Sequence, residues 1–272
     1  NWNKMKKCKI IIKDEVNCKV EGLELDARKY LLKKFEYEKP GARYLPAVRL
    51  GRWNGKVSYF SIGGTTYVNL LDEIIPYLYD VGYDIELEDN RQVHPEFKFQ
   101  EVTADTFSET CWPAGHERAG TPIVLRDYQV GIVNNFLANP QSIYSAATGS
   151  GKTITTAALS KGVEPYGRSI VIVPNKSLVL QTEADYVNLG LDVGVYFGDR
   201  KEHGRTHTIC TWQSLNNVFK VPVLSEMQEV RESMVDDVVA IVIDEVHQAT
   251  ASVLQSLLTG VYANVPLRWG LT

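Results

Sequence analysis

Residues 146–153, with the sequence AATGSGKT, combine the residue types that bind phosphate. Gly149 and Gly151 allow the backbone to close around an oxyanion with its amides pointing inward, and a helix that begins there adds its positive end. Lys152 can reach the β- and γ-phosphates of a nucleotide, and the hydroxyl of Thr153 can ligate Mg²⁺. The predicted nucleotide-binding residues of this loop are Thr148, Gly149, Ser150, Gly151, Lys152 and Thr153.

Two adjacent carboxylates, Asp244 and Glu245, follow the apolar run at 238–243. Such a run is typical of a central strand buried on both faces, and ligands bind at the carboxyl ends of strands in open α/β sheets. Asp244 can hold Mg²⁺ directly or through water, while Glu245 can activate the attacking water. One carboxylate after a strand is often only a helix cap, but this pair downstream of a phosphate loop favours phosphoryl transfer.

The elements that must position these groups alternate from Pro122 onward between strand and helix. That alternation predicts a parallel sheet covered by helices on both faces. The predicted strands are 142–146, 169–173, 192–196, 207–210, 238–243 and 267–271. The predicted helices are 126–138, 152–161, 176–189, 212–219 and 252–262, with an additional one at 224–234.

Positive charge is concentrated in the first part of the chain. Residues 1–60 hold 15 Lys and Arg against 7 Asp and Glu, which leaves 14 against 26 in the remainder. This asymmetry fits a nucleic-acid surface and equally a solvated basic face. The predicted elements are strands at 10–12 and 16–20, a basic amphipathic helix at 25–35, a hairpin of 57–62 and 66–70 around Gly63-Gly64, a helix at 71–81 and a strand at 84–87.

Three parts follow from these patterns. We predict a basic α+β nucleic-acid-binding domain over 1–90, a linker with one or two short helical pieces over 91–121, and an ATP-binding domain over 122–272.

Basic and aromatic side chains alternate around turn residues within 39–56. Arginine and lysine neutralise phosphates, and exposed aromatic rings can stack on unpaired bases. The alternative is that Tyr44 and Trp53 simply cap the core of a small domain. The predicted nucleic-acid contacts are Arg43, Tyr44, Arg49, Arg52, Trp53 and Lys56.

Composition excludes several classes. The chain has 272 residues, of which 44% are hydrophobic and 23% charged, as in ordinary globular domains. It contains no apolar run long enough for a membrane span and no evident signal peptide, and its 4 cysteines are far apart, which favours a reduced, cytoplasmic protein. His203, His207 and Cys210 faintly suggest a metal site, but no fourth ligand is near and we disfavour it.

Taken together, AATGSGKT at 146–153 and DEVH at 244–247 resemble motifs I and II of superfamily 2 helicases of the DExH type. That superfamily commonly has alanine at the position of Ala146, where other phosphate loops carry a glycine. Four further stretches agree in order, and the resemblance covers about 125–272. They are LRDYQ at 125–129 (similar to the Q-type motif), IVPNKSL at 172–178 with Gln181 (motif Ia), TWQSL at 211–215 (motif Ib) and GLT at 270–272 (the start of motif III).

The resemblance implies a RecA-like P-loop domain with a mostly parallel sheet, preceded by a small α+β domain, and the use of ATP and Mg²⁺. By position it implies catalysis by Lys152, Asp244 and Glu245, Mg²⁺ on Thr153 and Asp244, adenine contacts from Arg126 and Gln129, and coupling through His247 and Thr272. The residues implied to touch the DNA backbone are Pro174, Asn175, Lys176, Ser177, Thr211, Trp212, Gln213 and Ser214. For Trp212, packing in the core is a close alternative.

With GRWNGK at 51–56 joined to such a motor, the chain is similar to bacteriophage helicases that act on branched DNA. These unwind R-loops and D-loops, migrate branches and rescue stalled forks in recombination, replication and repair. The likeness implies DNA as partner, with RNA or an RNA–DNA hybrid open, a place in the host cytoplasm if the protein is phage-encoded, and a second RecA-like lobe with arginine fingers. These residues alone are then expected to hydrolyse ATP hardly at all. Two alternatives are the ATPase and translocase part of a restriction or packaging enzyme, and a DNA-binding module with a relic P-loop.

Overall fold

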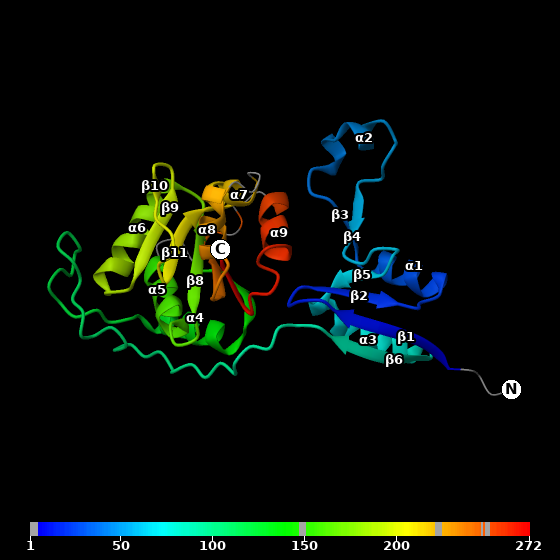
Figure 1. Ribbon diagram of the computed structural model, residues 1–272, viewed down its shortest axis with the longest axis horizontal. Helices are drawn as coiled ribbons and strands as arrows, with labels where there is room; N and C mark the ends of the chain where they lie inside the picture. The colour runs from blue at the N-terminus through cyan, green and yellow to red at the C-terminus, as the bar shows by residue number, and fades with distance from the viewer. Residues whose placement is uncertain (1–4, 147–150, 221–224, 246, 248–250) are drawn as a thin grey trace. The chain divides into compact units, whose positions relative to one another are not determined.

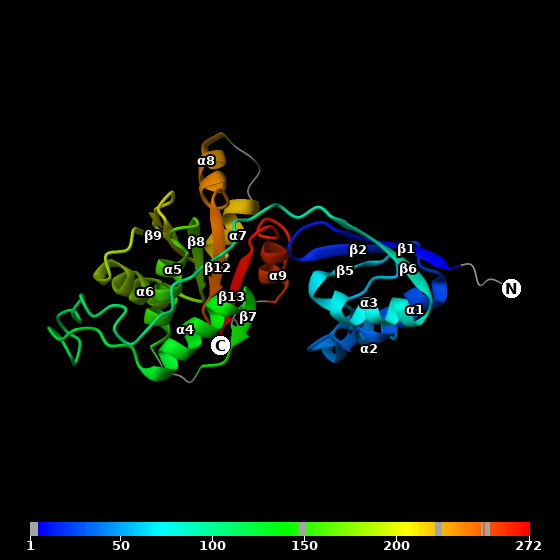
Figure 2. The same cartoon turned by 90° about the horizontal axis from the view of Figure 1, so that it is seen from below.

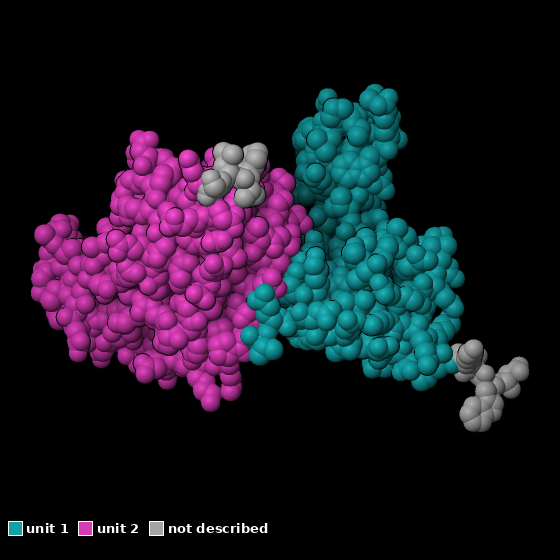
Figure 3. Space-filling model, viewed as in Figure 1, with its two compact units in different colours: residues 1–93 teal, residues 94–272 magenta. Residues whose placement is uncertain are grey.

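The structure is a computed structural model that describes residues 5–146, 151–220, 225–245, 247 and 251–272. The chain divides into two compact units, Asn1–Val93 and His94–Thr272, which Figure 3 shows in different colours. Each unit has its own buried apolar core, so each is described by itself.

The first unit is built on a four-stranded sheet with the order β5-β2-β1-β6. The strand β1 pairs antiparallel with β2 and parallel with β6, and two helices cover one face of the sheet (Figures 1 and 2). The elements are β1 (Lys6–Ile12), β2 (Asn17–Glu21), α1 (Leu25–Lys34), β5 (Thr65–Tyr67), α3 (Leu71–Asp80) and β6 (Tyr83–Asp89). All six lie close to their predicted positions, but β5 pairs with β2, which was not predicted.

Alternation of side chains explains why the helices lie on one face only. Ile10 and Ile12 of β1 are buried, whereas Ile11 between them is partly exposed, because successive side chains of a strand point to opposite faces. Leu31 of α1 and Ile74 of α3 are fully buried in the same cluster. The side chain of Asp14 accepts hydrogen bonds from backbone amides of the β1–β2 turn, which fixes that hairpin.

The predicted hairpin around Gly63-Gly64 is wrong. Strand β4 (Lys56–Ser58) pairs with β3 (Glu36–Glu38), and β5 pairs with β2. The turn itself docks on β2: the amide of Val20 donates to the carbonyl of Gly64 at 2.8 Å, and a Cβ on Gly64 would lie 2.1 Å from the Val20 carbonyl oxygen. The two flanking strands therefore find partners elsewhere.

Between β3 and β4 the chain forms two short helical turns, η1 (Ala42–Tyr44) and α2 (Pro46–Arg49). We call residues 36–58 the arm. It contains every residue between 39 and 56 for which nucleic-acid contact was predicted.

The second unit is built on a seven-stranded sheet with the order β10-β9-β11-β8-β12-β13-β7. All pairings are parallel except that of β10 with β9. The strands are β7 (Gln141–Tyr144), β8 (Arg168–Val173), β9 (Val193–Phe197), β10 (Arg200–Lys201), β11 (His207–Thr211), β12 (Val238–Ile243) and β13 (Leu267–Leu271). The two-residue β10 was not predicted; the others confirm the prediction.

Helices cover both faces of this sheet, as predicted (Figures 1 and 2). The helices α4 (Asp127–Ala138), α5 (Lys152–Val163) and α6 (Lys176–Asn188) pack on one face, and α7 (Trp212–Lys220), α8 (Ser225–Ser233) and α9 (Ala251–Thr259) on the other. Alternate residues of β8 divide between the two cores, with Val171 in one and Ile170 in the other. Among the described residues, no helix is long and apolar enough to cross a membrane.

The expected linker belongs largely to this second unit. From His94 to residue 121 the chain contains turns but no helix. Val102 and Phe107 are buried in the main core, and Phe99 packs edge-on against Trp269 at a centroid distance of 6.4 Å. We call residues 94–121 the strap. Its lack of periodicity hid this role, because a strap anchored by single side chains has no repeating pattern.

A buried polar network ties α5 to the sheet. His207 is fully buried; its Nε2 lies 2.8 Å from a carboxylate oxygen of Glu164, and its Nδ1 lies 2.6 Å from Ser169 Oγ. The carboxylate accepts, so Nε2 carries the proton and Nδ1 accepts from Ser169. Burial lowers the pKa of His207 below its ordinary value of 6.5, with Arg168 acting in the same direction and Glu164 and Asp192 opposing.

We expect acidification to destabilise the second unit through His207. Its pKa is lower in the folded than in the unfolded state, so its contribution is fully present above about pH 6.5 and is lost as the pH falls through the folded-state pKa. Melting temperatures between pH 7.5 and 5.5 should fall less steeply in His207→Gln than in the parent chain. His203→Gln is the control and should keep the parent's slope; equal slopes in all three chains would contradict the assignment.

Candidate nucleotide and nucleic-acid site

Sheet register brings the predicted motifs to one edge. Ile243 at the end of β12 lies beside Ile172 of β8 and Gly270 of β13, and Val173 lies beside Thr211 of β11. The residues that follow these parallel strands therefore leave the sheet at its carboxyl edge.

The phosphate loop ends at Gly151, which has φ +70° and leads directly into α5. This left-handed conformation favours glycine, and a Cβ here would lie 2.4 Å from Gln129 Nε2. The backbone conformation therefore explains the glycine before the lysine, since the Gln129 amide ends a flexible side chain that can move aside. The predicted contacts Thr148, Gly149 and Ser150 lie outside the described residues.

Lys152 and Glu245 form an ion pair. Lys152 Nζ lies 2.9 Å from Glu245 Oε1, and the two side chains are only 12% and 21% exposed. Glu245 has φ +51°, a conformation that a residue with a side chain seldom adopts, and such strain clusters at functional sites. The amide of the preceding Asp244 donates to the carbonyl of Ile172 at 2.8 Å, which fixes where the chain turns away from the sheet.

Asp244 is buried with an unsatisfied oxygen. It is 4% exposed, and its Oδ1 has no hydrogen-bonding partner among the described residues. Burial, followed by the charge of Glu245, raises the pKa of this carboxyl, while Lys152 opposes the shift. A cation would satisfy the free oxygen and restore the charged form, so the site fits Mg²⁺, a hard ion that prefers carboxylate oxygens.

Thr153 donates a hydrogen bond from its hydroxyl to Asp185 of α6. The hydroxyl keeps its lone pairs when it donates, so it remains able to ligate a cation. Burial raises the pKa of Asp185, with the hydrogen bond from Thr153 opposing. Sequence reasoning missed Asp185; the only available signal was its place one turn after Gln181, in the helix that follows motif Ia.

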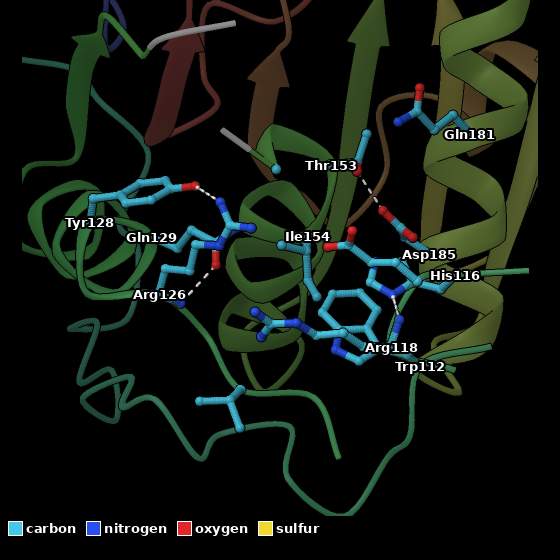
Figure 4. A pocket seen from close by; sticks show the side chains of 13 residues that line it. Trp112, His116, Arg118, Arg126, Tyr128, Gln129, Thr153, Ile154, Gln181 and Asp185 are labelled. Atoms are coloured by element: carbon cyan, nitrogen blue, oxygen red, sulfur yellow. Dashed lines mark hydrogen bonds between the residues drawn. The ribbon is translucent and has the colours of Figure 1, made fainter. Parts of the chain in front are cut away.

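A cavity of about 250 Å³ lies beside Thr153 (Figure 4). On one side are Arg126 and Gln129, which also cap α4: the Arg126 amide donates to Gln129 Oε1 at 2.9 Å. On the other side, the strap contributes Trp112 and His116, whose rings stack with a centroid distance of 4.1 Å. The structure thus places both predicted adenine-contacting residues next to the end of the phosphate loop. It also places residues of the strap in the lining of this cavity, which was not predicted.

The two residues predicted to couple nucleotide and nucleic-acid sites are in contact. His247 Nδ1 lies 2.9 Å from Thr272 Oγ1, and it also lies 3.4 Å from Glu245 Oε2. These contacts link the segments after β12 and β13 to the carboxylate that binds Lys152.

The residues of motifs Ia and Ib lie at the same edge with differing exposure. Asn175 caps α6 by accepting from the Leu178 amide at 3.0 Å. Thr211 is buried and bonds Ser214, and Trp212 is partly buried against the core, as its alternative interpretation held. The exposed members are Asn175, Lys176, Ser177 and Gln213, while Pro174, Trp212 and Ser214 are partly buried.

The arm exposes most of its predicted contacts. Arg43 lies over the ring of Tyr44 at 4.8 Å, and Tyr44 is 61% exposed. Trp53 is partly buried, and its indole donates to the carbonyl of Lys56 at 3.0 Å. Arg49 and Arg52 are exposed, whereas the ammonium of Lys56 lies 3.5 Å from Glu36.

Two of the three residues considered for a metal site, His207 and Cys210, lie in the core. Cys210 is fully buried, and His207 bonds Ser169 and Glu164 instead. Within the described part of the chain, no group of three or more His, Cys, Asp or Glu could hold a metal ion.

Comparison with known proteins identifies the class. Residues 122–272 match the family described as "Type III restriction enzyme, res subunit", and the chain belongs to that family. It is also similar to the ATP-dependent DNA helicase uvsW of Enterobacteria phage T4, with 24% identity over 249 residues, 88% of this chain and 46% of the relative. The chain thus spans about half the length of the curated relative it matches.

Two solved structures of the bacteriophage T4 helicase share the fold. One aligns with a TM-score of 0.70 over 97% of this chain and 91% of that one, and the other with 0.71 over 97% and 52%; both are 20% identical. The predicted fold, a RecA-like domain preceded by a small α+β domain, is confirmed. So are the predicted resemblance to superfamily 2 helicases and the predicted likeness to a bacteriophage helicase, which the comparisons give as UvsW.

Proposed function

We propose that this chain forms the ATP-binding lobe and a nucleic-acid-binding unit of an ATP-dependent DNA helicase that acts on branched DNA. The observation that carries the proposal is the cluster of Lys152, Glu245 and Asp244 at the carboxyl edge of the sheet, beside the end of a phosphate loop. These groups supply what phosphoryl transfer requires, which is positioning and charge stabilisation.

Each residue has a defined task in this proposal. Lys152 leaves Glu245 to bind the β- and γ-phosphates, which frees Glu245 to accept a proton from the attacking water. Thr153 and Asp244 would hold Mg²⁺, which neutralises phosphate charge when bound. Because His247 contacts Glu245 and Thr272 together, a change at the phosphates can reach the segment after β13.

The likeness to the phage helicase favours this function over a restriction or packaging translocase. That likeness extends over 88% of the chain, whereas the restriction-subunit family covers only 122–272. Coverage of that extent must include most of the basic first unit. We propose that the arm contacts DNA phosphates and that the loops after β8 and β11 track the backbone without reading sequence.

The proposal is tested by measuring binding of ATP and nucleic acids and ATP-dependent unwinding. Fluorescent ATP analogues and forked, duplex and single-stranded DNA and RNA should be titrated against this chain, and fork unwinding measured with the protein that carries it. Tight, salt-sensitive fork binding with ATP-dependent unwinding supports the proposal. ATP-dependent cleavage of DNA without unwinding would instead favour the restriction enzyme, and a clear preference for RNA would redirect the substrate assignment.

Removing the arm's positive charges should weaken DNA binding. Replacing Arg43, Arg49, Arg52 and Lys56 together by Ala is expected to raise the dissociation constant for forks about 10- to 1000-fold. The slope of the logarithm of the binding constant against the logarithm of salt concentration should decrease in magnitude by about one for each phosphate that the variant no longer neutralises. The measurement is fluorescence anisotropy at two salt concentrations.

A matched control separates the arm from net charge. Replacing Lys7, Lys13, Lys29 and Lys33 by Ala removes as many exposed cations from the same unit outside the arm. If both quadruple variants bind alike, the arm has no special part in binding.

A further inference from the structure

A cluster of tyrosines lies where the arm joins the four-stranded sheet. The rings of Tyr37 and Tyr59 stack at a centroid distance of 4.5 Å and an interplanar angle of 21°, and Tyr67 meets Tyr59 edge-on at 6.1 Å. The three residues come from β3, the segment after β4, and β5. We call them the tyrosine cluster.

This cluster is ordered and still exposed. Tyr37 is 37% and Tyr59 is 44% exposed, although stacking covers one face of each ring. The backbone beneath is fixed: the Tyr59 amide donates to the carbonyl of Phe35 at 3.1 Å, and its carbonyl accepts from Thr66 Oγ1 at 2.8 Å. A large amphipathic ring with few torsions to immobilise is suited to binding, because little entropy remains to be lost.

The arm has two chemically different faces. In the β3–β4 ladder Tyr37 lies opposite Val57. The ladder continues one residue beyond β3, because the amide of Lys39 donates to the carbonyl of Gly55 at 2.8 Å. Alternation along this extended segment places the side chain of Lys39 on the same face as that of Tyr37. Glu36 points to the other face, where it pairs with Lys56.

A hollow with cations in its lining follows strand β3 along the chain. Beyond Lys39 a hollow of about 330 Å³ is lined by Glu38, Lys39, Pro40, Gly41, Arg43 and Tyr44. Arg43 and Tyr44 stack there as a cation–π pair. The arm therefore offers stacked rings at its base and, beyond Lys39, positive charge and a further aromatic ring, with Glu38 also lining the hollow.

We propose that the arm binds an unpaired DNA strand between the tyrosine cluster and the hollow, with bases stacking on Tyr37 and Tyr59 and phosphates meeting Lys39 and Arg43. Proteins that hold single strands without sequence preference combine aromatic platforms with a basic track in this way. The excess of Lys and Arg in residues 1–60 provides the charge complementarity. The inference rests on the proposed function, and it assigns the unpaired strand of a branched substrate to the tyrosine cluster.

The experiment measures binding of the whole chain to a 15-nucleotide oligo-dT and to a blunt duplex. Tyr37→Leu/Tyr59→Leu should weaken single-strand binding about five- to 100-fold and duplex binding less than about threefold. Tyr37→Phe/Tyr59→Phe keeps the rings and should bind like the parent. The control is Tyr30→Leu/Tyr77→Leu, which removes another stacked pair of the same unit, 4.2 Å between centroids, and should leave binding unchanged.

A second measurement keeps the unaltered chain, in case the leucine variant does not fold. Iodouracil in the oligonucleotide cross-links to rings that stack on it, and peptide mapping should find the adduct on Tyr37 or Tyr59. Adducts found only on other residues would refute the proposal that bases stack on Tyr37 and Tyr59. So would a folded leucine variant that binds oligo-dT as tightly as the parent chain. If the tyrosine cluster failed this test but the arm variant without Arg43, Arg49, Arg52 and Lys56 still lost DNA binding, the proposed function would stand without the stacking role of the tyrosines. A parent chain that binds no nucleic acid would refute both the proposed function and this inference.

Discussion

Replacing Glu245 by Gln is expected to lower DNA-stimulated ATP hydrolysis about 10²- to 10⁴-fold while making ATP binding tighter. The loss of rate follows because Gln cannot accept the proton of the attacking water. The gain in affinity follows from the 2.9 Å ion pair to Lys152, which the phosphates must displace. A hydrogen bond between charged groups contributes about 1.5–3 kcal/mol, so releasing Lys152 should tighten binding about tenfold or more.

Two measurements separate these effects. Affinity is measured with a fluorescent ATP analogue on this chain, and phosphate release with the protein that carries it. Lys152→Ala is the matched control, since it breaks the same ion pair but removes the group that binds phosphate, so affinity should fall. If Glu245→Gln and Lys152→Ala both weakened ATP binding, Glu245 would support the position of Lys152 and would not compete with the phosphates for it.

The central strand and its carboxylates could be predicted from the sequence because their signals are local. The apolar run of β12 matches its predicted bounds, and Asp244 and Glu245 follow at once. The carboxyl-edge rule then places them beside the loop that precedes α5. The geometry between them could not be predicted, since the Lys152–Glu245 contact depends on the strand order of the sheet.

Long-range contacts account for what sequence reasoning missed. Asp185 meets Thr153 across two helices, and nothing in its neighbourhood in the sequence marks it. Trp112 looked like part of a linker, yet the strap brings it to the nucleotide cavity. The Gly63-Gly64 hairpin failed for a related reason: local turn chemistry was recognised, but competition from β2 and β3 decided the pairing.

Trp269 of β13 is the residue whose loss should most destabilise the second unit. It is 1% exposed and packs against Phe136 of α4 and Phe99 of the strap, and its indole donates to the carbonyl of Asn139 at 2.9 Å. Truncation of a buried Trp to Ala costs about 3–5 kcal/mol, and the Asn139 carbonyl loses one of its two donors, keeping that from Ser142 Oγ. That is a large part of the roughly 5–15 kcal/mol that stabilises an ordinary domain.

Calorimetry should therefore show Trp269→Ala shifting one transition and leaving the other in place. The two units have separate cores, so each is expected to unfold as its own transition, and only that of residues 94–272 should move to lower temperature. Trp269→Phe keeps most of the volume and should shift it much less. Trp53→Ala, in the arm, is the control and should leave the transition of the second unit unchanged. If Trp269→Ala moved neither transition, the strap and α4 would not depend on this ring, and the packing of the strap onto the nucleotide-binding unit would need another anchor.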